Sequence, residues 1–280
     1  MPDTTSQGNA VALTALRDAA ERTARMLRTA PDAAAPVPGL DWTAAETAAH
    51  LVGELSFYTG FLTGQRDARD LLETGSAAQT AAQTAAQRNA AANARQLREF
   101  PDRDMSRLAD SVVRAAEEFT AAAAGRPDSD SARVSNGMTI TVPVMTAALL
   151  GEQVVHGLDI ARAARLPWAI SPADANLVLD GVLAMVPEYV DRNAAAGRHL
   201  SYELRLRGGP RYLLCFDDGT LTVTGPGPKA DCVISADPVA FLLVGFGRTG
   251  QWGQIIRGKI TAGGRKPWLG PGFGRLLVRP

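Results

Sequence analysis

The stretch GEQVVHGLDIARAARLP, residues 151–167, decides the fold of the first part of the chain. Its apolar residues recur at spacings of three and four, which predicts a helix with one face in a core. Glu152 and His156 are one helical turn apart and lie on that same face. A buried carboxylate is costly unless it is paired. Something must therefore compensate Glu152, and a metal ion would do so.

Composition limits the class of protein. The chain has 280 residues and is 46% hydrophobic, which suits one large domain or two ordinary ones. Lys+Arg and Asp+Glu both number 29, and this zero net charge argues against a nucleic-acid partner. The first ten residues lack the pattern of a signal peptide. No stretch is apolar over the roughly 18 residues that span a membrane. We expect a cytoplasmic monomer or homodimer with no membrane or nucleic-acid partner.

The chain changes character near residue 195. Before it, alanine-rich segments predict long helices, with a capping box at Thr43 and Glu46 opening the second one. The AAQT repetition in residues 76–100 belongs to a third helical region, and an Asn-Gly turn predicts a short hairpin or an extended loop at 131–143. The predicted fold class is α+β. An up-down four-helix bundle occupies residues 1–195, and a smaller α+β domain occupies residues 196–280.

The second part has the alternation and turns of a small sheet. Residues 200–208 alternate with period two, and RYLLCFDDGTLTVTG at 211–225 reads as a hairpin with Asp-Gly at its turn. Asp237 and Pro238 open a helix. The segment GQIIRGKITAGG, residues 253–264, is expected to be strand-like.

A second helix offers a further ligand to the Glu152 and His156 pair. His50 lies among Leu51, Val52 and Leu55, and the chain has three histidines in all. Two nitrogens and one oxygen on facing helices would leave one coordination position open, as in catalytic zinc sites. Two other interpretations stay open from spacing alone. Glu152 and His156 can form a surface pair, and His50 can be a core histidine bonded to a backbone carbonyl.

Two segments together resemble a known family. DWTAAETAAHLVGEL, residues 41–55, followed by residues 151–167, is similar to the mycothiol-dependent maleylpyruvate isomerase family, within the DinB-like metal-binding helical bundles. That family has a Trp before its second helix, a His in that helix and a late Glu-x-x-x-His-Gly-x-Asp motif. The matching residues here are Trp42, His50, Glu152, His156, Gly157 and Asp159. The C-terminal strands, residues 202–208, 215–223 and 255–264, resemble the sterol-carrier-like module often fused behind that bundle.

The resemblance implies a divalent metal, usually zinc, held by His50, Glu152 and His156, with mycothiol as cosubstrate. Two interpretations of Asp159 stay open: it orients a ligating histidine, or it is only a surface residue. A cation lowers the pKa of a thiol bound to it, so the thiolate can attack an electrophilic small molecule. The function predicted is a mycothiol-dependent S-transferase or a cis–trans isomerase.

Substrate contacts are predicted from residue type. Arginine grips carboxylates with two parallel hydrogen bonds, and asparagines on one helix face can bond a polar thiol. The candidates are Arg248, Arg257 and Arg265 in the C-terminal part and Asn89, Asn93 and Arg95 in the third helical region. For each arginine the alternative is a solvated surface charge.

Two other functions remain open from the sequence. The C-terminal module can carry a lipid or another hydrophobic ligand, in which case the histidines have no part in activity. The bundle can instead hold zinc in a regulatory or interaction protein that leaves any thiol unaltered.

Overall fold

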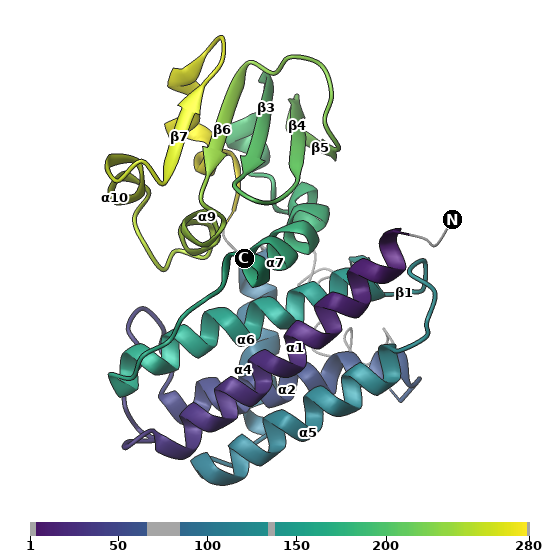
Figure 1. Ribbon diagram of the computed structural model, residues 1–280, viewed down its shortest axis with the longest axis vertical. Coiled ribbons are helices and arrows are strands. Elements are labelled where there is room, and N and C mark those ends of the chain that lie inside the picture. Colours follow the sequence, from purple (N-terminus) through teal and green to yellow (C-terminus); the bar gives the residue numbers. More distant parts are fainter. Residues whose placement is uncertain (1–3, 66–84, 134–137, 279–280) are drawn as a thin grey trace. The chain divides into compact units, whose positions relative to one another are not determined.

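The computed structural model describes residues 4–65, 85–133 and 138–278. The chain divides into two compact units, Met1–Ile170 and Ser171–Pro280, and Figure 1 shows the helices of the first and the sheet of the second. The division falls earlier than the boundary expected at residue 195. The reason is that the helix starting at Pro172 packs against a helix of the second unit.

The first unit is a helical bundle. Its long helices are α1 (Thr4–Thr29), α2 (Ala44–Leu62), α5 (Met105–Ala123) and α6 (Val142–Ala164). Helices α1 and α2 each pack against both α5 and α6, so α1 and α2 occupy opposite corners of the bundle (Figure 1). A further helix, α4 (Ala85–Glu99), packs against α2. This confirms the predicted helical bundle.

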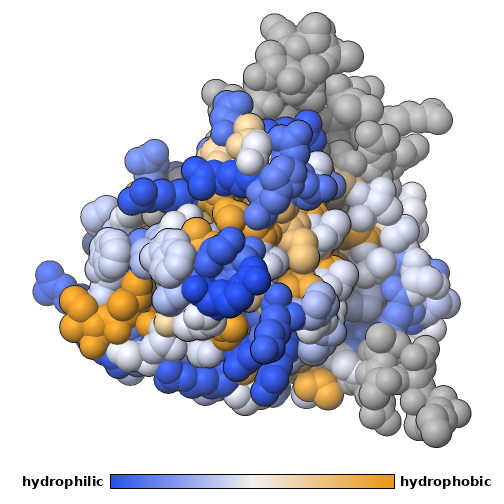
Figure 2. Space-filling model, turned by 90° about the horizontal axis from the view of Figure 1, so that it is seen from above, coloured by the Kyte–Doolittle hydropathy of each residue, from blue (hydrophilic) through white to orange (hydrophobic). Residues whose placement is uncertain are grey.

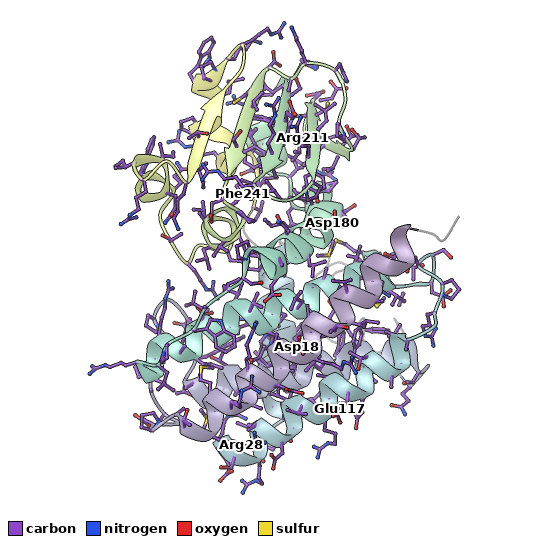
Figure 3. The ribbon with its side chains drawn as sticks, viewed as in Figure 1. Asp18, Arg28, Glu117, Asp180, Arg211 and Phe241 are labelled. Carbon is purple, nitrogen blue, oxygen red and sulfur yellow. The ribbon has the colours of Figure 1, made fainter. Side chains whose placement is uncertain are left out.

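Alanine sets how closely these helices approach. Fully buried alanines occur on α1, α2 and α5, and they alternate with large side chains such as Leu16, Leu51 and Phe119. Small residues let the large ones of a facing helix fill the space between helices, which gives close packing without voids. Other charged residues lie on the outer surface, as Asp18 and Glu117 do in Figure 3, whereas Asp159 is buried.

The helix ends follow the predicted chemistry. The Thr43 side chain accepts the N–H of Glu46, and the Glu46 carboxylate accepts the N–H of Thr43, so the capping box is present. Ser171 caps α7 (Pro172–Met185), with Pro172 in its first turn. These hydrogen bonds satisfy backbone donors that a helix start leaves without partners.

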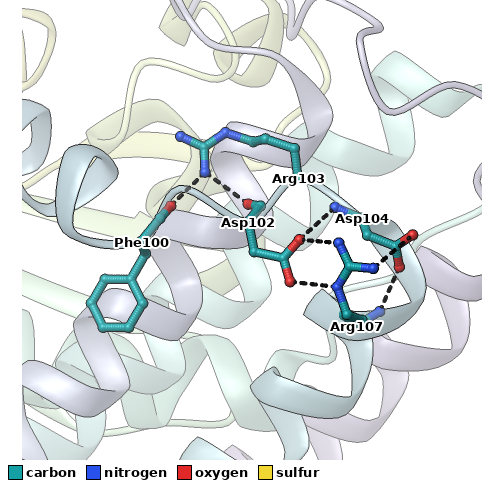
Figure 4. A network of polar contacts seen from close by, with 5 residues as sticks. All are labelled: Phe100, Asp102, Arg103, Asp104 and Arg107. Carbon is teal, nitrogen blue, oxygen red and sulfur yellow. Dashed lines mark hydrogen bonds and ion pairs between the residues drawn. The ribbon is translucent and has the colours of Figure 1, made fainter.

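The turn between α4 and α5 is fixed by arginines (Figure 4). The Arg103 guanidinium donates to the carbonyls of Leu97 and Asp102, at 3.0 and 2.7 Å, and to that of Phe100. Arg107 makes two hydrogen bonds to the Asp102 carboxylate, at 2.9 and 2.7 Å. The last carbonyls of α4 are thereby bound to the start of α5, which holds the C-terminal end of α4 in place.

Two sequence features fall partly outside the described residues. The AAQT repeats lie mostly in residues 66–84, and only the following helix α4 is described. The predicted Asn-Gly turn lies in residues 134–137, but the strands on either side, β1 (Ser131–Arg133) and β2 (Thr139–Thr141), pair antiparallel as expected of a hairpin.

The second unit contains a five-stranded sheet in the order β5-β4-β3-β6-β7. Strands β3 and β6 pair in parallel, and the other neighbours are antiparallel. The strands are β3 (His199–Leu206), β4 (Arg211–Asp217), β5 (Thr220–Thr224), β6 (Cys232–Ala236) and β7 (Ile260–Gly263). Asp218 and Gly219 both have positive φ, 43° and 81°, as the predicted Asp-Gly hairpin between β4 and β5 requires.

Helices and one aromatic cluster complete this unit. Helix α7 packs against α9 (Pro238–Gly245), which Asp237 caps as predicted. A short helix α8 (Arg192–Ala195) precedes β3, and a 3-10 segment, Pro267–Leu276, follows β7. Tyr202 packs edge-on against Phe216 and Phe273, with ring centroids 6.0 and 5.1 Å away. The predicted α+β class is therefore confirmed.

The prediction for residues 253–264 was wrong in its first half. Helix α10 spans Gln251–Ile256, and only β7 (Ile260–Gly263) is a strand. Gly258, with φ of 64°, lies between the two. A short apolar run such as Ile255–Ile256 fits either element, and its period alone does not decide between them. The positive φ of the glycine ends the helix before the strand begins.

Hydrophilic side chains cover most of the face shown in Figure 2, with hydrophobic ones between them. Within the described part of the chain, every helix is too short or too polar to cross a membrane.

One buried carboxylate links three segments of the second unit. Asp231, 7% exposed, accepts hydrogen bonds from the N–H and hydroxyl of Ser201. It also forms ion pairs with Arg265 and Lys266. The hydrogen bonds from Arg265 and Lys266 lower the pKa of Asp231 to about 2. Asp231 therefore joins β3, the start of β6 and the segment after β7.

We predict that Asp231→Asn lowers the free energy of unfolding by about 1 kcal/mol at neutral pH, because its cationic partners are largely exposed and water screens them. The folded-state pKa lies below the unfolded value, so this stabilisation is complete above about pH 4 and is lost as the pH falls toward 2. Urea unfolding of both proteins from pH 7 to pH 2 measures it. Asp217→Asn, which removes an exposed pair with His199, is the control and should change little. A difference that persists at pH 2 would contradict the assignment.

Candidate metal centre

His50 lies at the contact between α2 and α6. It is 3% exposed, and the alanine-rich stretch before it places its ring on the buried face of α2. Its Nδ1 lies 2.7 Å from Oε1 of Gln96, on α4. Its Nε2 lies 3.3 Å from Oε2 of Glu152, on α6. Both ring nitrogens therefore have polar partners inside the bundle, as a buried imidazole requires.

Glu152 and His156 come from one face of α6, as the spacing predicted. Oε2 of Glu152 lies 3.1 Å from Nε2 of His156, and the same oxygen faces His50. The side chains of Glu152 and His156 are 29% and 12% exposed. The site is thus closed toward the bundle and partly open at Glu152.

Three ligand atoms converge here. One atom each from His50, Glu152 and His156 lie within 4.8 Å of one another, which is close enough for a single ion. The two imidazole rings are nearly perpendicular, at 89°, with centroids 5.2 Å apart. Facing helices therefore bring together the three side chains that the sequence predicted as ligands.

A second layer of polar side chains holds this cluster. Nδ1 of His156 lies 3.0 Å from the Asp159 carboxylate, whose side chain is fully buried. The Oε1 atom of the Gln96 amide faces Nδ1 of His50. The Nε2 atom of the same amide donates to Oε1 of Glu54, at 2.8 Å. Asp159 is therefore in a position to orient His156. Partners of this kind fix the tautomer and orientation of ligating histidines in metal sites.

Gln96 and Glu54 were missed from the sequence. Glu54 follows His50 by four residues in HLVGE, the reverse of the EQVVH spacing on α6, and that signal places it on the same helix face as His50. Gln96 gave no such signal. Its position depends on how α4 packs against α2, which the local pattern around it does not encode.

Charges in the cluster perturb one another. Burial alone would raise the pKa of Glu152, but the hydrogen bonds from His156 and His50 outweigh it and hold that pKa well below its ordinary range. Burial alone would lower the pKa of His156, but the hydrogen bonds to Asp159 and Glu152 raise it to about 9. Burial raises the pKa of Glu54.

One aromatic side chain, Trp42, lies against both histidines, and another, Trp168, lies next to His156 in the fold. The Trp42 ring lies 4.9 Å from that of His50 and 6.1 Å from that of His156, between centroids. Trp168, which follows α6 in the sequence, packs directly on Gly157 of α6. Its indole N–H donates to the Val154 carbonyl at 3.0 Å. Gly157, next to His156, leaves the space that the Trp168 ring fills.

The remaining predicted contacts are placed as follows. Asn93 is half-buried on α4, one turn before Gln96, whereas the side chain of Asn89 lies outside the described residues. Arg95 pairs with Glu99 on the same helix, 2.8 Å apart. The other three arginines belong to the second unit: Arg248 donates to the Phe246 carbonyl, Arg257 to that of Gly253, and Arg265 to Asp231. Their role in binding substrate stays a prediction.

The first unit is thus a helical bundle with a His–Glu–His cluster at the contact of two helices, and an α+β unit follows it. Residues 13–161 match the family model described as the mycothiol maleylpyruvate isomerase N-terminal domain. The match covers more than half of the chain, and the chain belongs to this family.

Two solved structures share the fold. The crystal structure of a mycothiol-dependent maleylpyruvate isomerase is 13% identical, with a TM-score of 0.53 over 91% of this chain and 92% of that chain. A histidine-to-alanine mutant of a mycothiol-dependent maleylpyruvate isomerase gives 14% identity and a TM-score of 0.51 over the same shares. The inverting sec-alkylsulfatase Pisa1 from Pseudomonas sp. is 17% identical with a TM-score of 0.33, and the likeness covers 49% of this chain and only 24% of that one. No curated protein matches the sequence.

We predict that Gly157→Ala destabilises the first unit by about 1–3 kcal/mol, because the new methyl group would overlap the Trp168 ring. The ring is held by its bond to Val154 and by Arg22, whose guanidinium lies 5.6 Å from the ring centroid. Thermal and urea unfolding measure the change. Gly8→Ala is the matched control, since nothing lies within 4 Å of its added carbon on α1, and it should be neutral or stabilising. Equal effects of the two substitutions would refute the packing argument.

Proposed function

We propose that this chain is a metal-dependent enzyme that uses mycothiol as a thiol cosubstrate and acts on an electrophilic small molecule, by S-transfer or by cis–trans isomerisation. The observation that carries the proposal is the convergence of His50, Glu152 and His156 in a chain of this family. The two solved isomerases of the same fold are described as mycothiol-dependent, which supports the choice of thiol.

The donor set fits a divalent metal, and zinc best. Two imidazole nitrogens and one carboxylate oxygen are the ligand types that zinc takes in catalytic sites, where a fourth position stays free for a small molecule. His50 and His156 present Nε2 to Glu152 while their Nδ1 atoms face Gln96 and Asp159. The ligands are thus oriented toward one point by partners outside the set.

The residues around the proposed metal position favour the binding of a thiol. A divalent cation held there would lower the pKa of a neighbouring thiol and so supply a nucleophilic sulfur at neutral pH. His50 and Glu152 belong to different helices, so the packing of α2 on α6 sets their separation. The Trp42 ring packs against both imidazoles. The partly exposed Glu152 marks the side from which small molecules enter.

Polar contacts to the thiol and to the substrate are proposed at the residues predicted for them. Asn93 lies one turn from Gln96 on α4 and is half-buried, which suits a contact to the polar part of mycothiol. Asn89 follows the same helical spacing. Arg95, Arg248 and Arg257 are proposed for anionic groups of the substrate or thiol.

We predict that the purified protein binds about one zinc ion per chain and that His50→Ala and His156→Ala each lose it while the fold is kept. Metal analysis together with circular dichroism measures both quantities. His199→Ala replaces the third histidine, which is exposed in the second unit, and should keep the metal. A wild-type protein that binds no divalent metal, or a His156→Ala protein that keeps it, would overturn the metal site.

The reaction is tested separately. The zinc-loaded protein is incubated with mycothiol and a panel of electrophiles, including cis-unsaturated diacids, and product masses are followed. An isomerase leaves the substrate mass unchanged but shifts its chromatographic position, and a transferase adds the mass of the thiol. Both activities should disappear in Glu152→Gln and persist in His199→Ala. If zinc binds but every thiol and electrophile is recovered unaltered, the regulatory alternative is correct instead.

A further inference from the structure

We infer that Gln96, supplied by α4, is a positioning residue that fixes the tautomer of His50 so that its Nε2 presents a lone pair to a metal. This inference rests on the proposed metal site and goes beyond it, because it assigns a task to a helix that contributes no ligand.

The first step concerns the orientation of the Gln96 amide. Its Nε2 lies 2.8 Å from Oε1 of Glu54, and a carboxylate oxygen accepts the N–H that only the amide nitrogen can donate. The carbonyl oxygen of the amide must then point the other way, and it lies 2.7 Å from Nδ1 of His50. Glu54 therefore selects one of the two ways in which this amide can lie.

The second step concerns the imidazole. A carbonyl oxygen only accepts, so Nδ1 of His50 must carry the hydrogen that it donates to Gln96. In a neutral imidazole the other nitrogen then has a free lone pair. That nitrogen, Nε2, faces Oε2 of Glu152 at 3.3 Å, and two acceptors at this distance need a cation or a shared proton between them.

The third step concerns how firmly Gln96 is held. Gln96 is 8% exposed, and its side chain packs directly on Gly53. A carbon added at Gly53 would overlap the Gln96 side chain. The Phe100 N–H bonds to its backbone carbonyl at 2.9 Å, within the turn that Arg103 fixes (Figure 4). Gln96 is thus held by the backbone bond to Phe100, by the hydrogen bond to Glu54 and by packing on Gly53.

The two histidines have partners of different charge. His156 has the carboxylate of Asp159 behind it, whereas His50 has a neutral amide. Loss of such a partner typically weakens metal binding by about 10- to 100-fold. The same loss should be visible without metal, as a change in which nitrogen of His50 carries the hydrogen.

The experiment compares Gln96→Met with wild type in two measurements. Long-range ¹H–¹⁵N NMR of the metal-free protein assigns the tautomers of its three histidines, and competition with a chelator gives the zinc dissociation constant. We expect His50 to hold its hydrogen on Nδ1 in wild type and to lose that preference in Gln96→Met. Zinc affinity should fall by about 10- to 100-fold. Arg98→Met changes an exposed residue of the same helix to the same side chain and should leave both readouts unchanged.

A second variant separates loss of the Gln96 contact from a folding defect of Gln96→Met. Gly53→Ala keeps Gln96 but displaces its side chain, and it should shift His50 and zinc affinity in the same direction as Gln96→Met. A His50 tautomer that is unchanged in both variants, or zinc binding that is unchanged in both, would overturn the role of Gln96 while leaving the metal site intact. A wild-type protein without zinc would instead overturn the proposed function, and the metal-free tautomers would still decide whether Gln96 positions His50.

Discussion

The Glu152 carboxylate, held between His50 and His156, is the constraint around which the first unit is built. Polar and ionisable groups thereby lie at the contact of α2 and α6, within helices whose buried residues are mostly apolar. Such a network is favourable only when its members are satisfied, because each buried group without a partner costs free energy. Asp159, Gln96 and Glu54 supply the missing partners. The cluster and its supporting partners therefore come from three helices, although His50, Glu152 and His156 come from two.

Small residues make this arrangement possible. Gly53 and Gly157 lie close in sequence to His50 and His156, and each gives its space to a larger side chain, Gln96 in one case and Trp168 in the other. A methyl group at either position would push a supporting side chain away from the cluster. Glycine costs helical stability relative to alanine, by about 1 kcal/mol. Its use in both helices is explained by the packing that it allows beside the site.

The sequence analysis could single out the side chains of the cluster because most of them follow local periodicity. Glu152, His156 and Asp159 share α6, and the burial of His50 could be inferred from its apolar neighbours on α2. Gln96 could not be predicted, since its contact with His50 joins residues 46 positions apart and depends on the packing of α4. Helix α10 was predicted as a strand because a short apolar run fits both periods, and tertiary pairing begins only at Ile260. The compact units divide at residue 170, whereas composition, which follows helix content, suggested residue 195; α7 lies between the two positions and packs against α9.

The balance of charge explains why an amide rather than a carboxylate stands behind His50. Under the proposed function, a divalent cation, Glu152 and an incoming thiolate bring charges of opposite sign to one buried point. Asp159 already adds a negative charge behind His156. A second carboxylate directly behind His50 would lower the net positive charge further and disfavour an anionic thiolate at the open position. Gln96 orients the ring without adding a charge next to it. The hydrogen-bond chain from α4 thus orients a ligand while keeping the centre attractive to an anion.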